Sequence, residues 1–225
     1  MATDSDLASR AATAFHVAVF CKAPVSGRVK TRLIPALGAA QATAVYRQLV
    51  QRTLDTIQST RQEFQASASL WVADDLAHPD IRAWASGFDL PLYLQRGDDL
   101  GARMLHCMLS LHRHHQKVLL IGTDCPILQP RDVHSAAAAL GADQPWVFTP
   151  AEDGGYVLAG SCAPAATAFT GIAWSTDAVM TQTRSALAAA GMRWGEMPTL
   201  WDVDEPADVD RAAALDLLRC RAPGH

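Results

Sequence analysis

The stretch Lys117-Val-Leu-Leu-Ile-Gly-Thr-Asp-Cys-Pro126 decides the fold class of this chain. Its short aliphatic run is typical of a strand that is buried on both faces of a parallel sheet. Pro126 cannot continue the hydrogen-bonded ladder, so Asp124 stands where the strand leaves the sheet. Ligands bind at this end of the strands in open α/β sheets. Asp124 is therefore either a ligand for a divalent metal or a cap of the following turn.

Strand-like and helix-like segments alternate along the rest of the chain, which predicts βαβ units and an α/β fold. Apolar positions recur every three or four residues over 39–59, which predicts a helix that covers the sheet. Further strands are expected at 15–21, 69–73, 90–95, 146–149 and 192–197. Further helices are expected at 79–86, from 98 or 99 to about 114, at 130–140 and up to about 190.

Length and composition predict one domain. A chain of 225 residues, 49% of them hydrophobic, buries about 70% of its unfolded surface in one core. We expect that domain over residues 15–220. Residues 1–14 are polar and small, without the apolar core of a signal peptide, and are expected to form a flexible leader.

Charge, hydropathy and cysteine usage exclude several classes of protein. The net charge of −4 provides no field that attracts nucleic acid or an anionic membrane. No apolar run approaches the ~20 residues that a membrane-spanning helix needs. The five cysteines are scattered and never form Cys-x-x-Cys. They are expected to be thiols in a reducing cytoplasm.

A basic loop follows the first expected strand. Lys22, Arg28, Lys30 and Arg32 lie close together in the sequence. Two cations ~4 Å apart repel by about 1 kcal/mol in water, so the loop is either solvated or faces an anion. Neither a Walker A loop nor Gly-x-Gly-x-x-Gly is present, and we favour a different kind of phosphate-binding loop. Replacing Lys30 or Arg32 is expected to weaken nucleotide binding and to leave the fold intact.

Three later segments carry candidate ligands beside structural alternatives. Asp98 or Asp99 is placed to cap a helix. The run Glu152-Asp153-Gly154-Gly155-Tyr156 forms either a tight turn or a backbone that approaches a ligand. Asp204 or Glu205 is placed to cap the helix that begins at Pro206, and Asp204 becomes a candidate metal ligand only if it lies beside Asp124.

A histidine-rich segment ends the helix that is expected to finish near residue 114. It contains His112, His114 and His115. Cationic residues are favoured at the negative end of a helix, so we expect solvated side chains there rather than a metal site.

Five motifs occur in one order along nearly the whole chain. They are Lys22-Ala23-Pro24 with Lys30-Thr31-Arg32-Leu33, Asp99-Leu100-Gly101-x-Arg103-Met104, Gly122-Thr123-Asp124-Cys125-Pro126, Glu152-Asp153-Gly154-Gly155-Tyr156, and Asp202-Val203-Asp204-x-Pro206-x-Asp208. Together they resemble bacterial arsenosugar-biosynthesis-type glycosyltransferases of the nucleotide-diphospho-sugar transferase superfamily. The first and last motifs also resemble phospholactate and molybdenum-cofactor guanylyltransferases.

This resemblance implies a fold and a set of site residues. The fold is the Rossmann-like, three-layer GT-A fold with a mixed, mostly parallel central sheet. Asp124 and Asp204 match ligands of Mg²⁺ or Mn²⁺, although the Asp-x-Asp of many such glycosyltransferases is absent, since Cys125 and Pro126 follow Asp124. The implied nucleotide- and phosphate-binding residues are Lys22, Ala23, Pro24, Gly27, Arg28, Lys30, Arg32, Asp99, Gly101 and Arg103. The implied acceptor-binding residues are Glu152, Gly154, Gly155, Tyr156 and Trp174.

We therefore expect a metal-dependent transferase that moves a glycosyl group from a nucleotide-diphospho-sugar to a small-molecule acceptor. Lys30 and Asp153 are the expected catalytic residues, Lys30 assisting the departing diphosphate and Asp153 acting as the general base. The alternatives are a nucleotidylyltransferase that binds a nucleoside triphosphate and releases pyrophosphate, and a nucleotide-binding module without turnover. The dense positive charge of the basic loop favours the first alternative.

Overall fold

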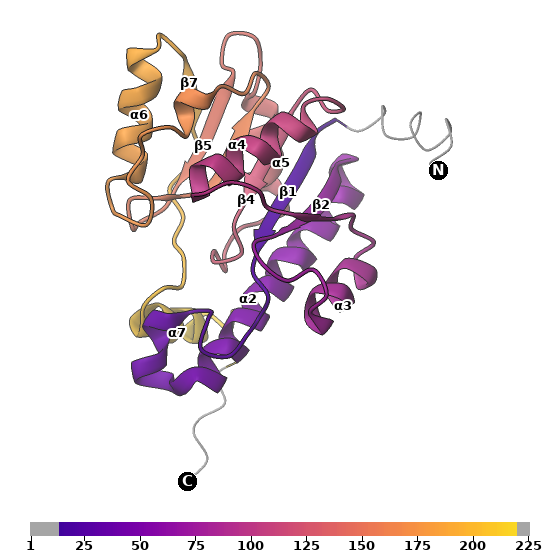
Figure 1. The fold of residues 1–225 in the computed structure, drawn as a ribbon, viewed down its shortest axis with the longest axis vertical. Helices are drawn as coiled ribbons and strands as arrows, with labels where there is room; N and C mark the ends of the chain where they lie inside the picture. Colours follow the sequence, from indigo (N-terminus) through magenta and orange to yellow (C-terminus); the bar gives the residue numbers. More distant parts are fainter. Residues whose placement is uncertain (1–13, 220–225) are drawn as a thin grey trace.

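The computed structural model describes residues 14–219, and its strands form one seven-stranded sheet in the order β3-β2-β1-β4-β6-β5-β7 (Figure 1). The strands are β1 (His16–Cys21), β2 (Ser67–Val72), β3 (Leu92–Leu94), β4 (Val118–Ile121), β5 (Trp146–Pro150), β6 (Tyr156–Ser161) and β7 (Trp194–Glu196). Only β6 runs antiparallel to its neighbours, β4 and β5. The expected mixed, mostly parallel sheet is confirmed.

Helices cover both faces of this sheet. They are α2 (Ile34–Phe64), α3 (Pro79–Gly87), α4 (Leu100–Leu111), α5 (Pro130–Ala139), α6 (Val179–Ala189) and α7 (Pro206–Ala214), with short 3₁₀ turns η1 (Thr31–Leu33) and η2 (Ala166–Ala168). One core cluster joins α2, α3 and α5 to the sheet, and a second joins α4 and α6 to it. The three-layer architecture follows from these two clusters.

The central strand β1 shows how the sequence produces the layers. All of its residues are buried, as the unbroken apolar run predicts. Successive side chains of a strand point to opposite faces. Val17 and Val19 accordingly pack in the α2 cluster, while Ala18 and Phe20 pack in the α4 cluster.

The first turn of α2 is separated from the rest of the helix by Gly38, whose φ of 76° and ψ of 158° are not helical. The long part of the helix therefore begins at Ala39, as predicted, and continues to Phe64 rather than residue 59. The start of α2 packs against α7 in a third cluster, which contains Leu33, Trp201 and Val203. This cluster ties the basic loop to the far end of the described chain.

Several expectations from the sequence need adjustment. The edge strands β3 and β7 are shorter than predicted, three residues each. His112 is half-buried rather than solvated, and burial lowers its pKa, while His115 stacks on His16 with ring centroids 4.3 Å apart. Residues 1–13 of the expected leader lie outside the described range.

The described residues also show the state of the cysteines and the character of the helices. Cys21, Cys107, Cys125 and Cys162 are free thiols, and Cys220 lies beyond the described residues. Among residues 14–219, no helix combines the length and the apolar character that crossing a membrane requires.

Candidate active site

A cleft of about 530 Å³ opens beside the carboxyl ends of β1 and β4. The basic loop forms one wall with Lys22, Arg28, Lys30 and Arg32, and Arg103 of α4 adds a fifth cation. Asp124 and Asp204 provide carboxylates, and the apolar part includes Phe20, Leu100 and Met104. The cavity is of the size that holds a small-molecule ligand.

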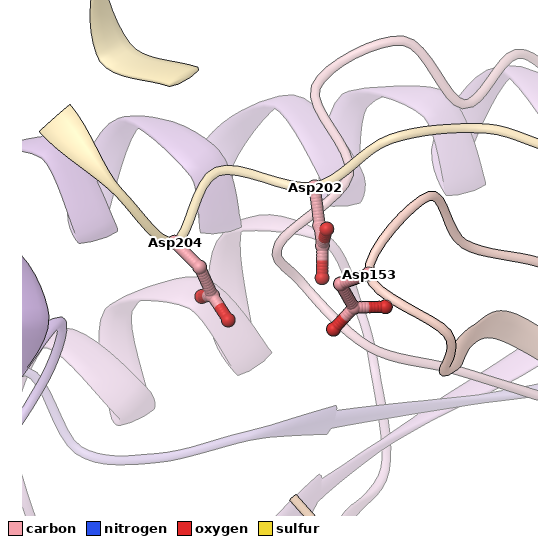
Figure 2. A group of neighbouring side chains, drawn as sticks. All are labelled: Asp153, Asp202 and Asp204. Carbon is pink, nitrogen blue, oxygen red and sulfur yellow. The ribbon is translucent and has the colours of Figure 1, made fainter. Parts of the chain in front are cut away.

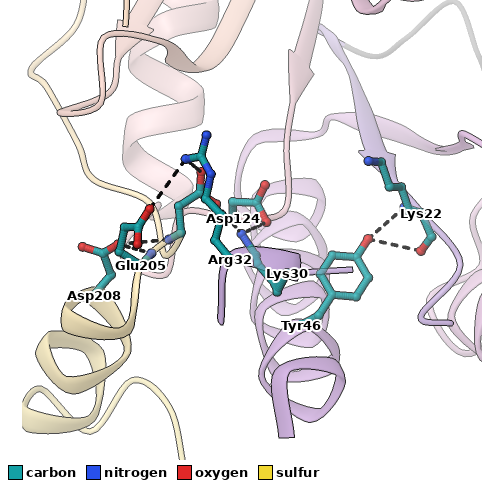
Figure 3. A network of polar contacts seen from close by, with 8 residues as sticks. Lys22, Lys30, Arg32, Tyr46, Asp124, Glu205 and Asp208 are labelled. Atoms are coloured by element: carbon teal, nitrogen blue, oxygen red, sulfur yellow. Dashed lines mark hydrogen bonds and ion pairs between the residues drawn. The ribbon is translucent and has the colours of Figure 1, made fainter. Parts of the chain in front are cut away.

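At the base of this cleft, the Lys30 ammonium lies between two carboxylates (Figure 3). Its Nζ atom is 2.6 Å from Asp124 Oδ1 and 2.9 Å from Asp204 Oδ1. Burial alone would lower the pKa of Lys30, but the two carboxylates raise it above its ordinary value. Lys30 therefore stays in its charged form at the point where the two predicted metal ligands meet.

This arrangement corrects the expectation that Lys30 belongs to an exposed loop. Its side chain is only 6% exposed. The Lys30 backbone has φ 47° and ψ 47°, in the left-handed region that side chains other than glycine rarely adopt. The chain turns at this residue and directs the side chain inward, so its replacement would affect the fold as well as ligand binding.

The rest of the basic loop is divided between the cleft and the scaffold. Arg32 is 59% exposed, and its Nη1 lies 3.6 Å from Asp204 Oδ2. The Tyr46 hydroxyl accepts from the Lys22 backbone N–H at 2.8 Å and donates to the Lys22 carbonyl at 3.1 Å. Ala23 donates its N–H to Asp74 Oδ1. Ala23, Pro24 and Gly27 do not line the cleft.

Asp204 does not cap α7, which was the structural alternative to a role in the site. Glu205 is the N-cap, and the Asp208 carboxylate accepts from the backbone N–H groups of Asp204 and Glu205 at 3.0 and 2.7 Å. The Asp204 side chain is thus left to face Lys30. The structure brings Asp204 and Asp124 together, and their role as metal ligands stays a prediction.

A group of three carboxylates lies next to this ion pair (Figure 2). Asp153, Asp202 and Asp204 each place one oxygen within 4.8 Å of the others. Asp153 comes from the turn before β6, and its Oδ1 accepts from the Gly155 N–H at 2.8 Å. Burial, followed by the repulsion of Asp153, Asp204 and Asp124, raises the pKa of Asp202 to about 7.

Asp202 was not predicted as a site residue, although a signal for it was present in the sequence. Asp202 and Asp204 lie two residues apart on either side of the buried Val203, and in an extended chain side chains at that spacing point to the same side. This spacing therefore predicts that Asp202 and Asp204 belong to the same site.

The motif that opens α4 contributes Leu100, Arg103 and Met104 to the cleft and two residues to the scaffold. Asp99 is the N-cap and accepts from the Ala102 N–H at 2.7 Å. A Cβ on Gly101 would lie 2.4 Å from the Phe169 carbonyl oxygen and 2.7 Å from the Trp174 indole nitrogen. Arg103 reaches the cleft. Asp99 and Gly101 do not line it and serve here to build the helix and its packing.

The expected acceptor-binding residues are only partly brought to the cleft. Tyr156 lines it, and Trp174 packs edge-on behind Tyr156 with ring centroids 6.4 Å apart. Glu152 instead forms an ion pair with Arg211 at 2.7 Å, away from the cleft lining. Gly154 is held close to the Asp177 backbone, and Gly155 does not line the cleft either.

Gln95 is a cleft residue that the sequence did not single out. The residue is 8% exposed, and its amide nitrogen donates to the carbonyl oxygens of Cys21 and Trp71 at 3.3 and 2.9 Å. Both amide hydrogens are thus used within the protein. This fixes the orientation of the amide and leaves its oxygen as the group available to a ligand.

Comparison with known proteins gives a family and a fold. The model of the DUF2064 family, described as uncharacterized protein conserved in bacteria, matches residues 56–176. No curated protein matches the chain. A structure from Desulfovibrio desulfuricans G20, provisionally described as a nucleotide-diphospho-sugar transferase, is 27% identical with a TM-score of 0.76 and covers 86% of this chain and 83% of its own.

Two more distant structures share the fold. CMP:2-keto-3-deoxy-manno-octonic acid synthetase, complexed with CTP, is 14% identical with a TM-score of 0.55, over 90% of this chain and 98% of its own. Glucosyl-3-phosphoglycerate synthase from Mycobacterium tuberculosis, in complex with Mn²⁺ and UDP, is 12% identical with a TM-score of 0.51, over 96% of this chain and 81% of its own. The fold is therefore that of nucleotide-diphospho-sugar transferases. The narrower arsenosugar-biosynthesis family is not identified by these matches.

Proposed function

The chain belongs to the DUF2064 family, and from its fold and the geometry of the cleft we propose that it is a metal-dependent transferase that uses an activated nucleotide. Its reaction is transfer of a glycosyl group from a nucleotide-diphospho-sugar to a small-molecule acceptor. The similarity to the Desulfovibrio protein, provisionally described as a nucleotide-diphospho-sugar transferase, supports this class of donor.

The observation that carries the proposal is how the cations of the cleft are distributed. Lys30 is engaged by Asp124 and Asp204, and Arg32 approaches Asp204 and Glu205. The sequence placed both in a phosphate-binding loop, where dense charge favoured a triphosphate. Arg32 stays paired, and Lys30 can face phosphate only when another cation takes its place between the carboxylates. Within residues 14–219, Lys22, Arg28 and Arg103 are therefore the cleft cations without such a partner, which suits a diphosphate better than a triphosphate.

We assign the apolar part of the cleft to the nucleobase. Phe20, Leu100 and Met104 offer the apolar surface that a flat ring needs. The fixed amide oxygen of Gln95 is an acceptor for an N–H group of the base. Arg28 and Arg103 would then donate to the diphosphate, and charge-assisted hydrogen bonds of this kind are the stronger ones.

The residues present fit a divalent cation. Carboxylate oxygens are the ligands that Mg²⁺ and Mn²⁺ prefer. Burial, followed by the repulsion of three neighbouring carboxylates, raises the pKa of Asp202, and a bound cation would relieve that repulsion. We assign the cation to Asp202 and Asp204, with Asp124 next to them. When bound, it would neutralise charge that develops on the leaving nucleoside diphosphate.

Asp153 is the residue that we assign as general base. It is the exposed member of the three carboxylates and lies at the rim of the acidic group. The acceptor hydroxyl oxygen would bond to the anomeric carbon while the bond from that carbon to the β-phosphate oxygen breaks. The hydroxyl proton would pass to Asp153, and the nucleoside diphosphate would leave with the bonding electrons.

The test is to incubate the purified protein with Mn²⁺ and, in separate mixtures, nucleotide-sugars or nucleoside triphosphates with candidate sugar phosphates. Nucleoside diphosphate released only from nucleotide-sugars supports the proposal, and Asp153→Asn should suppress it. Pyrophosphate from the triphosphate mixture would instead show nucleotidylyl transfer. Binding without product in either mixture would indicate a nucleotide-binding module.

A further inference from the structure

We propose that the Lys30 ammonium is an internal counter-ion that occupies the space between Asp124 and Asp204 in the metal-free protein and leaves it when a divalent cation binds. This inference rests on the proposed function, because it concerns the metal of that reaction. The inference goes beyond the proposed function because it gives Lys30 a role in metal binding as well as in holding phosphate.

The first support is the quality of the ion pair. A single ammonium contacts one oxygen from each of two carboxylates, at 2.6 and 2.9 Å, and its side chain is almost completely buried. The residues that meet here are far apart in the chain, since Lys30 and Asp204 are separated by 174 positions. The left-handed backbone of Lys30 directs its side chain to this point at a conformational cost.

The second support is that Asp204 belongs to two groups at once. One of its oxygens contacts Lys30, and an oxygen of the same carboxylate lies within 4.8 Å of oxygens from Asp153 and Asp202. A divalent cation held by Asp204 at about 2.0–2.6 Å would lie next to the ammonium. Like charges so close repel strongly in a partly buried site, so the cation and Lys30 compete for this carboxylate.

The cleft offers a space toward which the ammonium could move. Lys30 lines the cleft, as do Arg28 and Arg103. The four-carbon stem of a lysine is flexible, so the ammonium can swing toward the space that we assign to the diphosphate. Metal binding would thus convert Lys30 from a carboxylate partner into a phosphate partner, and prepare the cleft for the nucleotide.

The first experiment measures binding of Mn²⁺ alone by electron paramagnetic resonance, without nucleotide. We expect Lys30→Met to bind Mn²⁺ about tenfold more tightly than the wild type, because the competing charge is gone. Lys30→Arg keeps the charge and should stay near the wild type. Lys22→Met is the matched control, since Lys22 lines the same cleft and forms no ion pair among residues 14–219. Equal or weaker binding by a folded Lys30→Met would overturn the proposal.

The second experiment uses the wild-type protein and does not depend on the folding of a variant. Amine acylation followed by peptide mass spectrometry reports how accessible Lys30 is. We expect slow labelling without metal and several-fold faster labelling with saturating Mn²⁺, while Lys117, which donates to the Ala137 carbonyl, should not change. Unchanged labelling of Lys30 would refute the exchange. Both readouts are independent of turnover, so the absence of glycosyl transfer would reject the proposed function and leave this inference standing.

Discussion

Replacing Asp202 by Asn should make the protein more stable, by an amount that grows with pH. Burial and the neighbouring carboxylates raise the pKa of Asp202 from its ordinary value of 3.8 to about 7. Between these values the folded protein holds a proton that the unfolded chain has released. The free energy of unfolding therefore falls as the pH rises from about 4 to about 7.

The size of this effect on the free energy of unfolding follows from the difference between the folded and unfolded pKa of Asp202. A pKa difference of about 3 corresponds to ~4 kcal/mol if it is fully realised. Asp202 is only partly buried, and solvent screens its charge. We therefore expect about 1–2 kcal/mol. The asparagine keeps the shape of the side chain and cannot ionise, so it escapes the penalty.

Urea unfolding of the wild type and Asp202→Asn at pH 5, 6, 7 and 8 measures the difference. The variant should gain little at pH 5 and most at pH 8, and Mg²⁺ should reduce its advantage by stabilising the wild type. A stability difference that does not depend on pH would refute this account of Asp202. Asp202→Ala would be a poor substitute, because it also removes packing.

Three further predictions follow from the site and its packing. Lys30→Ala should lower the free energy of unfolding in urea by about 1–3 kcal/mol, because two carboxylates lose their shared partner; unchanged stability would mean that the ion pair contributes nothing. Gly101→Ala should cost about 1–3 kcal/mol in the same assay, because its Cβ would enter the Phe169 carbonyl. Gly87→Ala is its control, since Gly87 faces open space and should be neutral or gain up to about 1 kcal/mol. Arg103→Ala should weaken UDP binding in calorimetry by about 1.5–3 kcal/mol, whereas Glu152→Gln, outside the cleft lining, should not change it.

The layered fold could be predicted from the sequence because its signals are local. Unbroken apolar runs mark β1 and β4, and the three-and-four spacing after Gly38 marks the face of α2 that covers the sheet. These patterns depend on residues a few positions apart. The short edge strands were overestimated, since few neighbours hold a strand at the edge of a sheet.

The sequence predicted a site residue only where a charged residue directly follows a recognisable buried strand. Asp124 could be nominated from Pro126 and the apolar run before it. The burial of Lys30 could not, because it depends on a left-handed turn and on a carboxylate 174 positions away. For the same reason, the raised pKa of Asp202 depends on three carboxylates that only the folded chain brings together.

The reversal of β6 has a geometric consequence. An antiparallel strand presents its first residue at the edge where parallel neighbours present their last, so the hairpin between β5 and β6 has its tip at the ligand-binding edge. Were β6 parallel, its first residue would lie at the opposite edge, a strand length away, about 15–20 Å. Because β6 is reversed, the end of β5 and the start of β6 lie at the same edge of the sheet. The tip of a hairpin can also change in length without moving the sheet, so the position of Asp153 can change in this turn while the strands stay in place.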